Sequence, residues 1–280
     1  MKKLLSLLFV LTISLCFIGS TSFAAKNNKK GSSKKNNVKV EQKVEVKNPI
    51  KEDKALEMVL NSASAGDFEA TKYLIEESNI DINYADSNGT TILMKACCNT
   101  NLDLVKYLIE NKADITKTDK RNYNALMYAI EKSDLDVVRY LFEDSTIDAK
   151  KLITDQFGLL SLSIKNSDFH VIKYLIENQG FDMTLLDNNG ATLAMIAASY
   201  GNMDVVKYLI DYKIDTDIKD KNGNNILMYA VKSGNLDLVE YLVNSSIVDI
   251  NEKNNNNKTA KDIAVENNQV EIVKFLNQKV

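Results

Sequence analysis

Few residues of this 280-residue chain are suited to catalysis, and they do not converge. The only histidine, His170, begins an amphipathic stretch at the position where the corresponding stretches carry Asp103, Asp136, Asp204 and Asp237. An acidic residue there is favoured by the positive end of a helix, so we interpret His170 as a substitution at an exposed position and not as a catalytic base. The carboxylates recur at matching positions instead of pairing for general acid–base chemistry.

Metal and cofactor chemistry is equally poorly supported. One histidine and three cysteines exclude a multi-histidine metal site and a disulfide-rich scaffold. The sequence contains no glycine-rich phosphate loop and no nucleophile elbow. We therefore expect a protein that is not an enzyme, with no catalytic residues, no cofactor and no metal site.

Two adjacent cysteines, Cys97 and Cys98, fall on an expected helix. Neighbours on a helix point about 100° apart, so a disulfide between them would open the helix. We predict Cys97 as a small core residue. Cys98 lies one step round towards the surface and either keeps its thiol or forms a disulfide with another molecule.

Residues 1–24 have the pattern of a secretory signal peptide. Lys2 and Lys3 precede an apolar run from Leu4 to Ile18, and Ser22-Phe23-Ala24 supplies a small-x-small cleavage site. The run is shorter than the roughly 20 residues that span a bilayer, which favours cleavage and export over a membrane anchor. A composition rich in Lys, Asn and Ile suggests a bacterium with AT-rich DNA, so we expect a periplasmic or extracellular protein.

Residues 25–51 form a Lys-rich segment with little to bury. Nine Lys against Glu41 and Glu45 give it a charge of +7, which predicts a flexible tether. It is either a simple spacer or a weak contact to anionic envelope components. Residues 52–280 carry 24 Lys and Arg against 36 Asp and Glu. The net charge of −3 thus hides a basic arm joined to an acidic domain, which makes that domain a poor candidate for binding nucleic acid.

The pair Tyr-Leu recurs through residues 52–280 with a period of 33 or 34 residues. Its tyrosines are Tyr73, Tyr107, Tyr140, Tyr174, Tyr208 and Tyr241, and Phe275-Leu276 continues the series. Such a period predicts a solenoid. In the repeat that starts at Asp86, an Asp-x-x-Gly turn precedes a short helix with Thr91 as its N-cap. Residues 102–109 then form a second helix with an apolar stripe.

The order of turn, helix, loop and helix resembles the ankyrin-repeat family over residues 52–280. The family's Thr-Pro-Leu-His stretch appears as Thr91-Ile-Leu-Met94, Asn124-Ala-Leu-Met127, Thr192-Leu-Ala-Met195 and Asn225-Ile-Leu-Met228, with Pro missing and Met in place of His. Its Ala-Ala-x-x-Gly appears at 197–201. The resemblance implies an all-α solenoid of about seven helix-turn-helix repeats with capping end repeats. Lys261, at the position of Leu93 and Leu126, fits a last repeat on which nothing stacks.

The fourth repeat is irregular. Asp155 lies fourteen residues beyond Leu141, whereas Asp119 lies eleven beyond Leu108. We interpret residues 149–152 as an insertion before a rebuilt finger. The insertion is either a tolerated loop change or a specialised contact.

The resemblance also implies that the finger tips and the first helices form a concave groove that binds other proteins. Because aromatic residues and Arg carry most interface energy, we single out Arg121, Tyr123, Phe157 and Tyr200, together with Lys120, Asn88, Asn189 and Asn222. The repeated tyrosine of the Tyr-Leu pair is expected to stack repeats together and not to bind a partner.

The resulting prediction is a monomeric, non-catalytic interaction module that binds a protein partner as an exported scaffold or adaptor. A secreted effector or inhibitor that masks a host protein or enzyme surface is the alternative. A display array tethered to the cell wall or membrane is a third, weaker reading.

Overall fold

The computed structural model of the chain describes residues 49–99, 101–144, 147–166 and 169–279. The predicted signal peptide and residues 25–48 of the predicted tether lie outside this part. The chain divides after Asp114 into two compact units, each of which we describe by itself. No helix in the described ranges has the length and apolar character needed to cross a bilayer.

The first unit contains two pairs of packed helices. Helix α2 (Pro49–Ser64) packs on α3 (Phe68–Glu77), and α4 (Ile92–Cys97) packs on α5 (Leu102–Glu110). Helix α2 also contacts α4, which stacks one pair on the other. Because α2 begins at Pro49, it takes in the last three residues of the predicted tether; Pro is well tolerated in the first turn of a helix.

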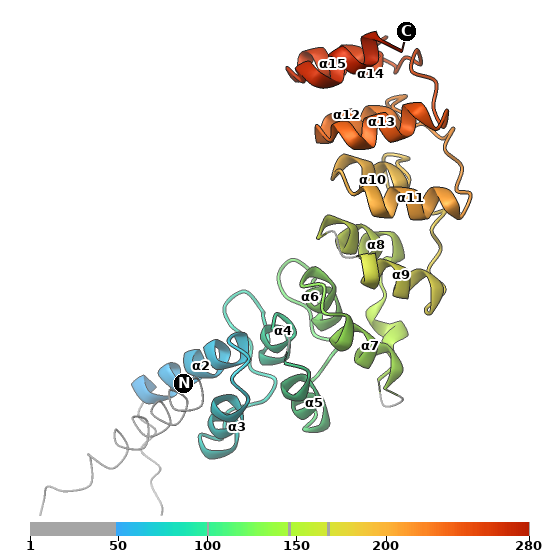
Figure 1. Cartoon of the computed structure of the whole chain (residues 1–280). Helices are drawn as coiled ribbons and strands as arrows, with labels where there is room; N and C mark the ends of the chain where they lie inside the picture. The colour runs from blue at the N-terminus through green and yellow to red at the C-terminus, as the bar shows by residue number, and fades with distance from the viewer. Residues whose placement is uncertain (1–48, 100, 145–146, 167–168, 280) are drawn as a thin grey trace, which may run out of the picture. The chain divides into compact units, whose positions relative to one another are not determined.

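The second unit repeats this pairing five times over its described residues. Its helices are α6 (Ala125–Glu131), α7 (Leu135–Glu143), α8 (Gln156–Lys165), α9 (Phe169–Glu177), α10 (Leu193–Ser199), α11 (Met203–Asp211), α12 (Ile226–Ser233), α13 (Leu236–Asn244), α14 (Ala260–Glu266) and α15 (Val270–Asn277). The first helices α6, α8, α10, α12 and α14 pack in series. Figure 1 shows α8, α10 and α12 along one side of the unit and α9, α11 and α13 along the other. The all-α solenoid prediction is confirmed.

The first helices start at side-chain caps, as predicted for Thr91. The Thr91 hydroxyl accepts a hydrogen bond from the Met94 N–H at 3.2 Å, and the Thr91 N–H donates to the Met94 sulfur at 3.4 Å. Thr192 and Met195 repeat the arrangement at 3.1 and 3.5 Å. The Met that replaces the family's His therefore completes a local capping box, and such caps contribute about 1 kcal/mol each.

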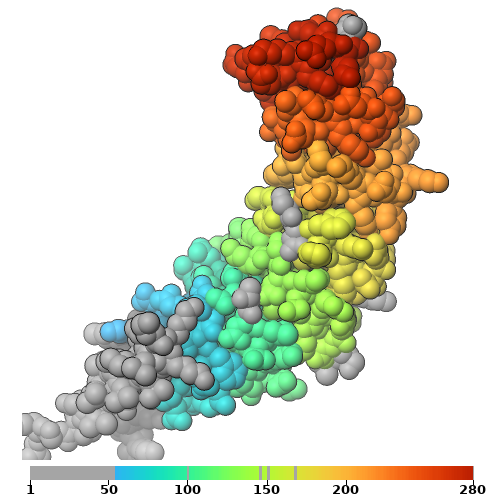
Figure 2. All heavy atoms as spheres, in the orientation of Figure 1, coloured from blue at the N-terminus to red at the C-terminus, as the bar shows by residue number. Residues whose placement is uncertain are grey.

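The second helices bury the predicted apolar stripe. Leu104, Val105 and Leu108 are fully buried in α5, and Ile109 is half-buried. Side chains of successive repeats in the second unit fill the space between helices and leave one continuous body of atoms (Figure 2). Hydrophobic burial along this stripe is the main force that stacks one repeat on the next.

The last repeat has the polar outer position that the sequence predicts. Leu93, Leu126 and Leu227 are at most 1% exposed, whereas Lys261 at the equivalent position is half-exposed. Val265 and Val270 are more than half exposed in the same repeat.

The fourth repeat differs from the rebuilt finger that we expected. Residues Ala149–Leu152 form a single 3-10 turn, η1, and Asp155 stands at the N-cap of α8 without a side-chain capping bond. Aligning the repeats by their helices puts Ile153 at the position of Asp119 and Asp187. The turn-forming carboxylate is therefore missing, and η1 followed by an earlier start of α8 replaces the finger.

Candidate functional site

Five turns before first helices share one set of hydrogen bonds. Asp220 Oδ1 accepts from the backbone N–H groups of Asn222 at 2.9 Å and Asn224 at 2.7 Å. The Asp220 N–H donates to the Asn224 carbonyl at 2.9 Å and closes the turn. The same bonds recur around Asp86, Asp119, Asp187 and Asn254. We call these turns the fingers: residues 86–90, 119–123, 187–191, 220–224 and 254–258.

The last three fingers are joined edge to edge. The Lys221 N–H donates to the Asn189 carbonyl at 2.8 Å, and the Asn255 N–H donates to the Asn222 carbonyl at 2.9 Å. Gly223 has a φ of +76°, and a Cβ there would lie 2.6 Å from the Asn255 amide oxygen. This close approach requires glycine. Two predicted binding residues, Asn189 and Asn222, thus have fixed backbones and exposed side chains.

Arg121, the first of the predicted interface residues, is bound within its own repeat. Its Nε donates to Asp119 Oδ2 at 3.1 Å and its Nη2 donates to the Tyr128 hydroxyl at 2.8 Å. The Tyr128 hydroxyl in turn donates to Asp119 Oδ2 at 2.8 Å, and the guanidinium lies 4.4 Å from the ring centre of Tyr123. Half of the Arg121 side chain remains exposed. Arg121 and Tyr123 are therefore brought together as a rigid, partly exposed cluster.

These contacts shift the pKa of the finger carboxylates and of the tyrosines that face them. Burial disfavours the ionised form of Asp119, but the hydrogen bonds that it accepts outweigh burial and lower its pKa. The Asp220 pKa is lowered in the same way, and the Tyr229 hydroxyl donates to Asp220 Oδ2 at 2.9 Å. Burial and the adjacent Asp220 carboxylate raise the pKa of Tyr229. The nine-residue spacing from Asp to Tyr, shared by these two repeats, was a sequence signal for this contact.

The other predicted residues occupy different settings. Tyr200, the C-cap of α10, is 51% exposed, and Lys120 on the finger before α6 is also exposed. Phe157 is half-buried in the first turn of α8. Asn88 is exposed on the finger of the first unit.

Five of these eight residues are exposed on one surface of the second unit. We call it the inner face and define it as the exposed side chains of residues 119–133, 155–166, 187–201 and 220–234, which comprise fingers and first helices. Lys120, Arg121, Asn189, Tyr200 and Asn222 belong to it, and Tyr123 lies half-buried within it. We call the exposed side chains of the second helices the outer face.

The recurring tyrosines link successive repeats on the outer side, as predicted. Tyr174 donates its hydroxyl to Glu143 of the preceding repeat at 3.2 Å, and Tyr208 donates to Glu177 at 3.3 Å. Tyr107 makes the same bond to Glu76 at 3.2 Å inside the first unit. Arg139, next to Tyr140 in the chain, lies 5.7 Å from the Tyr174 ring centre. The sequence predicted the stacking role of the tyrosines but not their glutamate partners, which lie three residues after Tyr73, Tyr140 and Tyr174.

Comparison with known proteins agrees with this geometry. The family model for ankyrin repeats, three copies, matches residues 59–155, 160–254 and 213–279. The chain belongs to the ankyrin-repeat family. A crystal structure of the human ASB11 ankyrin repeat domain has a similar fold, with a TM-score of 0.66, 20% sequence identity and coverage of 79% of this chain and 97% of that chain. No match was found among curated proteins.

Ankyrin repeats are generally modules for protein–protein interaction, and the family is one of binding scaffolds and not of catalysts. His170 is exposed in the first turn of α9. Cys97 is buried, Cys98 is half-buried, and neither forms a disulfide within the described chain. Across the described ranges no group of three or more His, Cys, Asp or Glu side chains is arranged to hold a metal ion.

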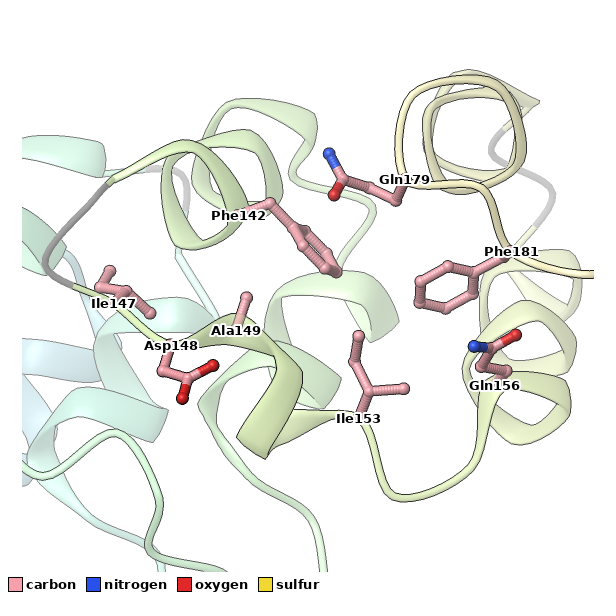
Figure 3. A pocket seen from close by; sticks show the side chains of 8 residues that line it. All are labelled: Phe142, Ile147, Asp148, Ala149, Ile153, Gln156, Gln179 and Phe181. Carbon is pink, nitrogen blue, oxygen red and sulfur yellow. The ribbon is translucent and has the colours of Figure 1, made fainter.

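The irregular fourth repeat borders a pocket of about 600 Å³. Phe142, Ile153 and Phe181 supply apolar walls, and Gln156 and Gln179 stand at its rim (Figure 3). Phe142 and Phe181 meet edge to face, with ring centres 6.2 Å apart. The pocket lies where an ankyrin finger is replaced by η1 and does not include the predicted interface residues.

Proposed function

We propose that this ankyrin-repeat protein is an exported scaffold or adaptor that binds a protein partner through the inner face of its second unit. One observation carries the proposal: the residue type recurs from repeat to repeat at linking positions on the outer side, whereas it changes at equivalent positions on the inner face. On the outer side, tyrosine and glutamate recur because they link the repeats. On the inner face, the position at the end of each first helix, eight residues before the recurring tyrosine, holds Lys132, Asn166, Tyr200 and Ser233 in turn. Stacking does not require a particular side chain there, which leaves these positions for recognition.

The rigid fingers support this assignment. The edge-to-edge bonds of the last three fingers fix their backbones before any partner arrives. A preorganised surface loses less conformational entropy on binding, which favours affinity.

The export part of the proposal is supported by the signal-peptide pattern of residues 1–24. Cell fractionation tests it directly. We expect a shortened chain in the periplasm or the medium, and recovery of the full-length chain in the cytoplasm would contradict export.

Two tyrosines provide a matched test of the binding face. Tyr200 and Tyr212 are 51% and 49% exposed, and they cap α10 and α11 on the inner and outer side respectively. We expect Tyr200→Ala to reduce capture of the cellular partner by at least about tenfold, as an exposed aromatic anchor would. Tyr212→Ala should leave capture unchanged. Equal capture by both variants and the unaltered protein would count against the inner face.

A further inference from the structure

We infer that the partner segment bound by the inner face is acidic and extended; the inference rests on the proposed function and specifies the chemistry of its partner. The observation is a separation of charge between the two faces of the second unit. Six cations are exposed on the inner face, Lys120, Arg121, Lys132, Lys165, Lys221 and Lys232, against one exposed carboxylate, Asp155; the first helix of the last repeat, which lies outside this face as defined, exposes Asp262 and Glu266. This is the reverse of the domain as a whole, in which acids outnumber bases.

The outer face carries the opposite charge. Its exposed acids are Asp136, Glu143, Glu177, Asp204, Asp211, Asp237 and Glu271, and its exposed cations are Arg139, Lys173 and Lys274. Each of these three cations lies within ion-pair distance of a glutamate on its own helix. The outer cations are thus neutralised locally, whereas Lys132 and Lys165 have no ion-pair partner among the described residues.

Local structure accounts for only part of the inner charge. Lys132, Lys165 and Lys232 lie at or next to the C-terminal ends of first helices, where the helix dipole favours a cation. The dipole gives no reason for Lys120 or Lys221, which lie on fingers. Finger carboxylates such as Asp119 and Asp220 are buried and hydrogen-bonded to their own turns, so they add no exposed negative charge. The result is a surface whose exposed charge is almost entirely positive.

The geometry of the repeats favours an extended occupant. Packed helices lie about 8–10 Å apart, so Lys132 and Lys165, at the ends of α6 and α8, are separated by about one such step, and Lys165 and Lys232, with α10 between their helices, by about two. An extended chain rises about 3.3 Å per residue. Carboxylates about three residues apart would therefore meet Lys132 and Lys165, and a carboxylate about six residues further on would meet Lys232, with the Tyr200 ring between the last two lysines.

A nucleic acid fits the same surface less well. Proteins that bind single strands combine cations with a series of aromatic platforms, and Tyr200 is the one large aromatic that is exposed on the described inner face. An acidic protein segment needs only the local positive surface.

The test uses a labelled synthetic peptide of about twelve extended residues with Glu at every third position, and fluorescence anisotropy with the purified chain. Controls are the same peptide with Gln for Glu and a single-stranded oligonucleotide of equal charge. We expect binding of the Glu peptide only, weakening when salt is raised from about 50 to 300 mM.

Charge-matched variants locate the binding. We expect Lys132→Gln/Lys165→Gln/Lys232→Gln to weaken the Glu peptide by about tenfold. The control variant Lys173→Gln/Lys213→Gln/Lys274→Gln changes two lysines of the outer face and the exposed Lys213 just after α11; it has the same net charge and should change affinity less than about twofold. Lys-to-Arg changes at the inner positions should keep the affinity, and circular dichroism checks that each variant is folded.

Three results would overturn the inference: equal binding of the Gln peptide, equal loss in both triple variants, or tighter binding of the oligonucleotide. Each of them leaves the proposed function standing if Tyr200→Ala still loses partner capture while Tyr212→Ala does not. If neither tyrosine variant affects capture, the inner-face function itself fails.

Discussion

Asp220 bonds to several parts of its repeat at once. Oδ1 accepts two backbone N–H groups of the finger, and Oδ2 accepts from the Tyr229 hydroxyl at 2.9 Å and from Asn224 Nδ2 at 2.9 Å. Asn254 makes the two finger bonds with an amide in the last repeat, so the turn itself does not require a carboxylate. A carboxylate differs from the amide in having a second acceptor oxygen, Oδ2, which accepts the hydrogen bonds from Tyr229 and Asn224.

We predict that Asp220→Asn lowers the free energy of unfolding by about 1–3 kcal/mol, because an NH₂ group would replace the oxygen that faces two donors. Asp187→Asn is the matched control, since only Oδ1 of Asp187 has described hydrogen bonds. We expect it to cost less than about 0.5 kcal/mol. Urea denaturation measures both values, and equal costs would show that Oδ2 has no special role.

Arg121 shows what residue types alone leave open. Its chemistry favoured a binding role, yet its guanidinium is hydrogen-bonded to Asp119 and Tyr128. A substitution there would disturb the finger as well as any partner, which makes Tyr200 the better probe. The sequence placed both residues on the correct elements, but side-chain partners depend on packing between those elements.

At the level of the helices, the outer ladder of tyrosines and glutamates has a measurable pH dependence. Burial and the adjacent Glu143 raise the pKa of Tyr174 to about 12, and burial and Glu76 raise that of Tyr107. A raised pKa means that the folded state holds its proton where the unfolded state loses it. The stabilising contribution is therefore complete below pH 10 and is lost as the pH rises towards 12.

We predict that Tyr107 and Tyr174 ionise above pH 10, the ordinary pKa of a tyrosine, in an ultraviolet absorbance titration of the folded protein. Glu143→Gln should lower the pKa of Tyr174, because it removes the adjacent negative charge. The urea midpoint should fall as the pH rises from about 10 to about 12. A single tyrosine transition near pH 10, unchanged in the variant, would argue against the ladder.

The elements themselves were largely predictable from the sequence. The N-cap at Thr91, the second helix at 102–109 and the stacking role of the tyrosines all follow from local pattern and period. The finger of the fourth repeat was harder to predict. Ile153 replaces its aspartate, and Asp155, two residues later, resembles a finger aspartate in the sequence. Whether a turn forms there depends on the partner atoms and not on the residue type.

At the scale of the whole molecule, the outer surface of the last repeat affects whether one molecule stacks on another. Lys261 keeps the outer surface of the last repeat polar beside the exposed Val265. We predict that Lys261→Leu enlarges this apolar surface and produces concentration-dependent association, measured by light scattering after gel filtration. Lys213→Leu, after α11, should remain at the mass of the unaltered protein. No change in mass for Lys261→Leu would show that the cap does not limit stacking.

We propose that the second unit binds a protein through its inner face. A photo-cross-linking residue placed at Asn222 tests it, with the same residue at Asp237 on the outer face as the control; both positions are exposed. We predict that in cells the Asn222 position forms one discrete adduct with another protein and that the Asp237 position forms none. An adduct from Asp237 alone, or from both positions equally, would contradict binding at the inner face.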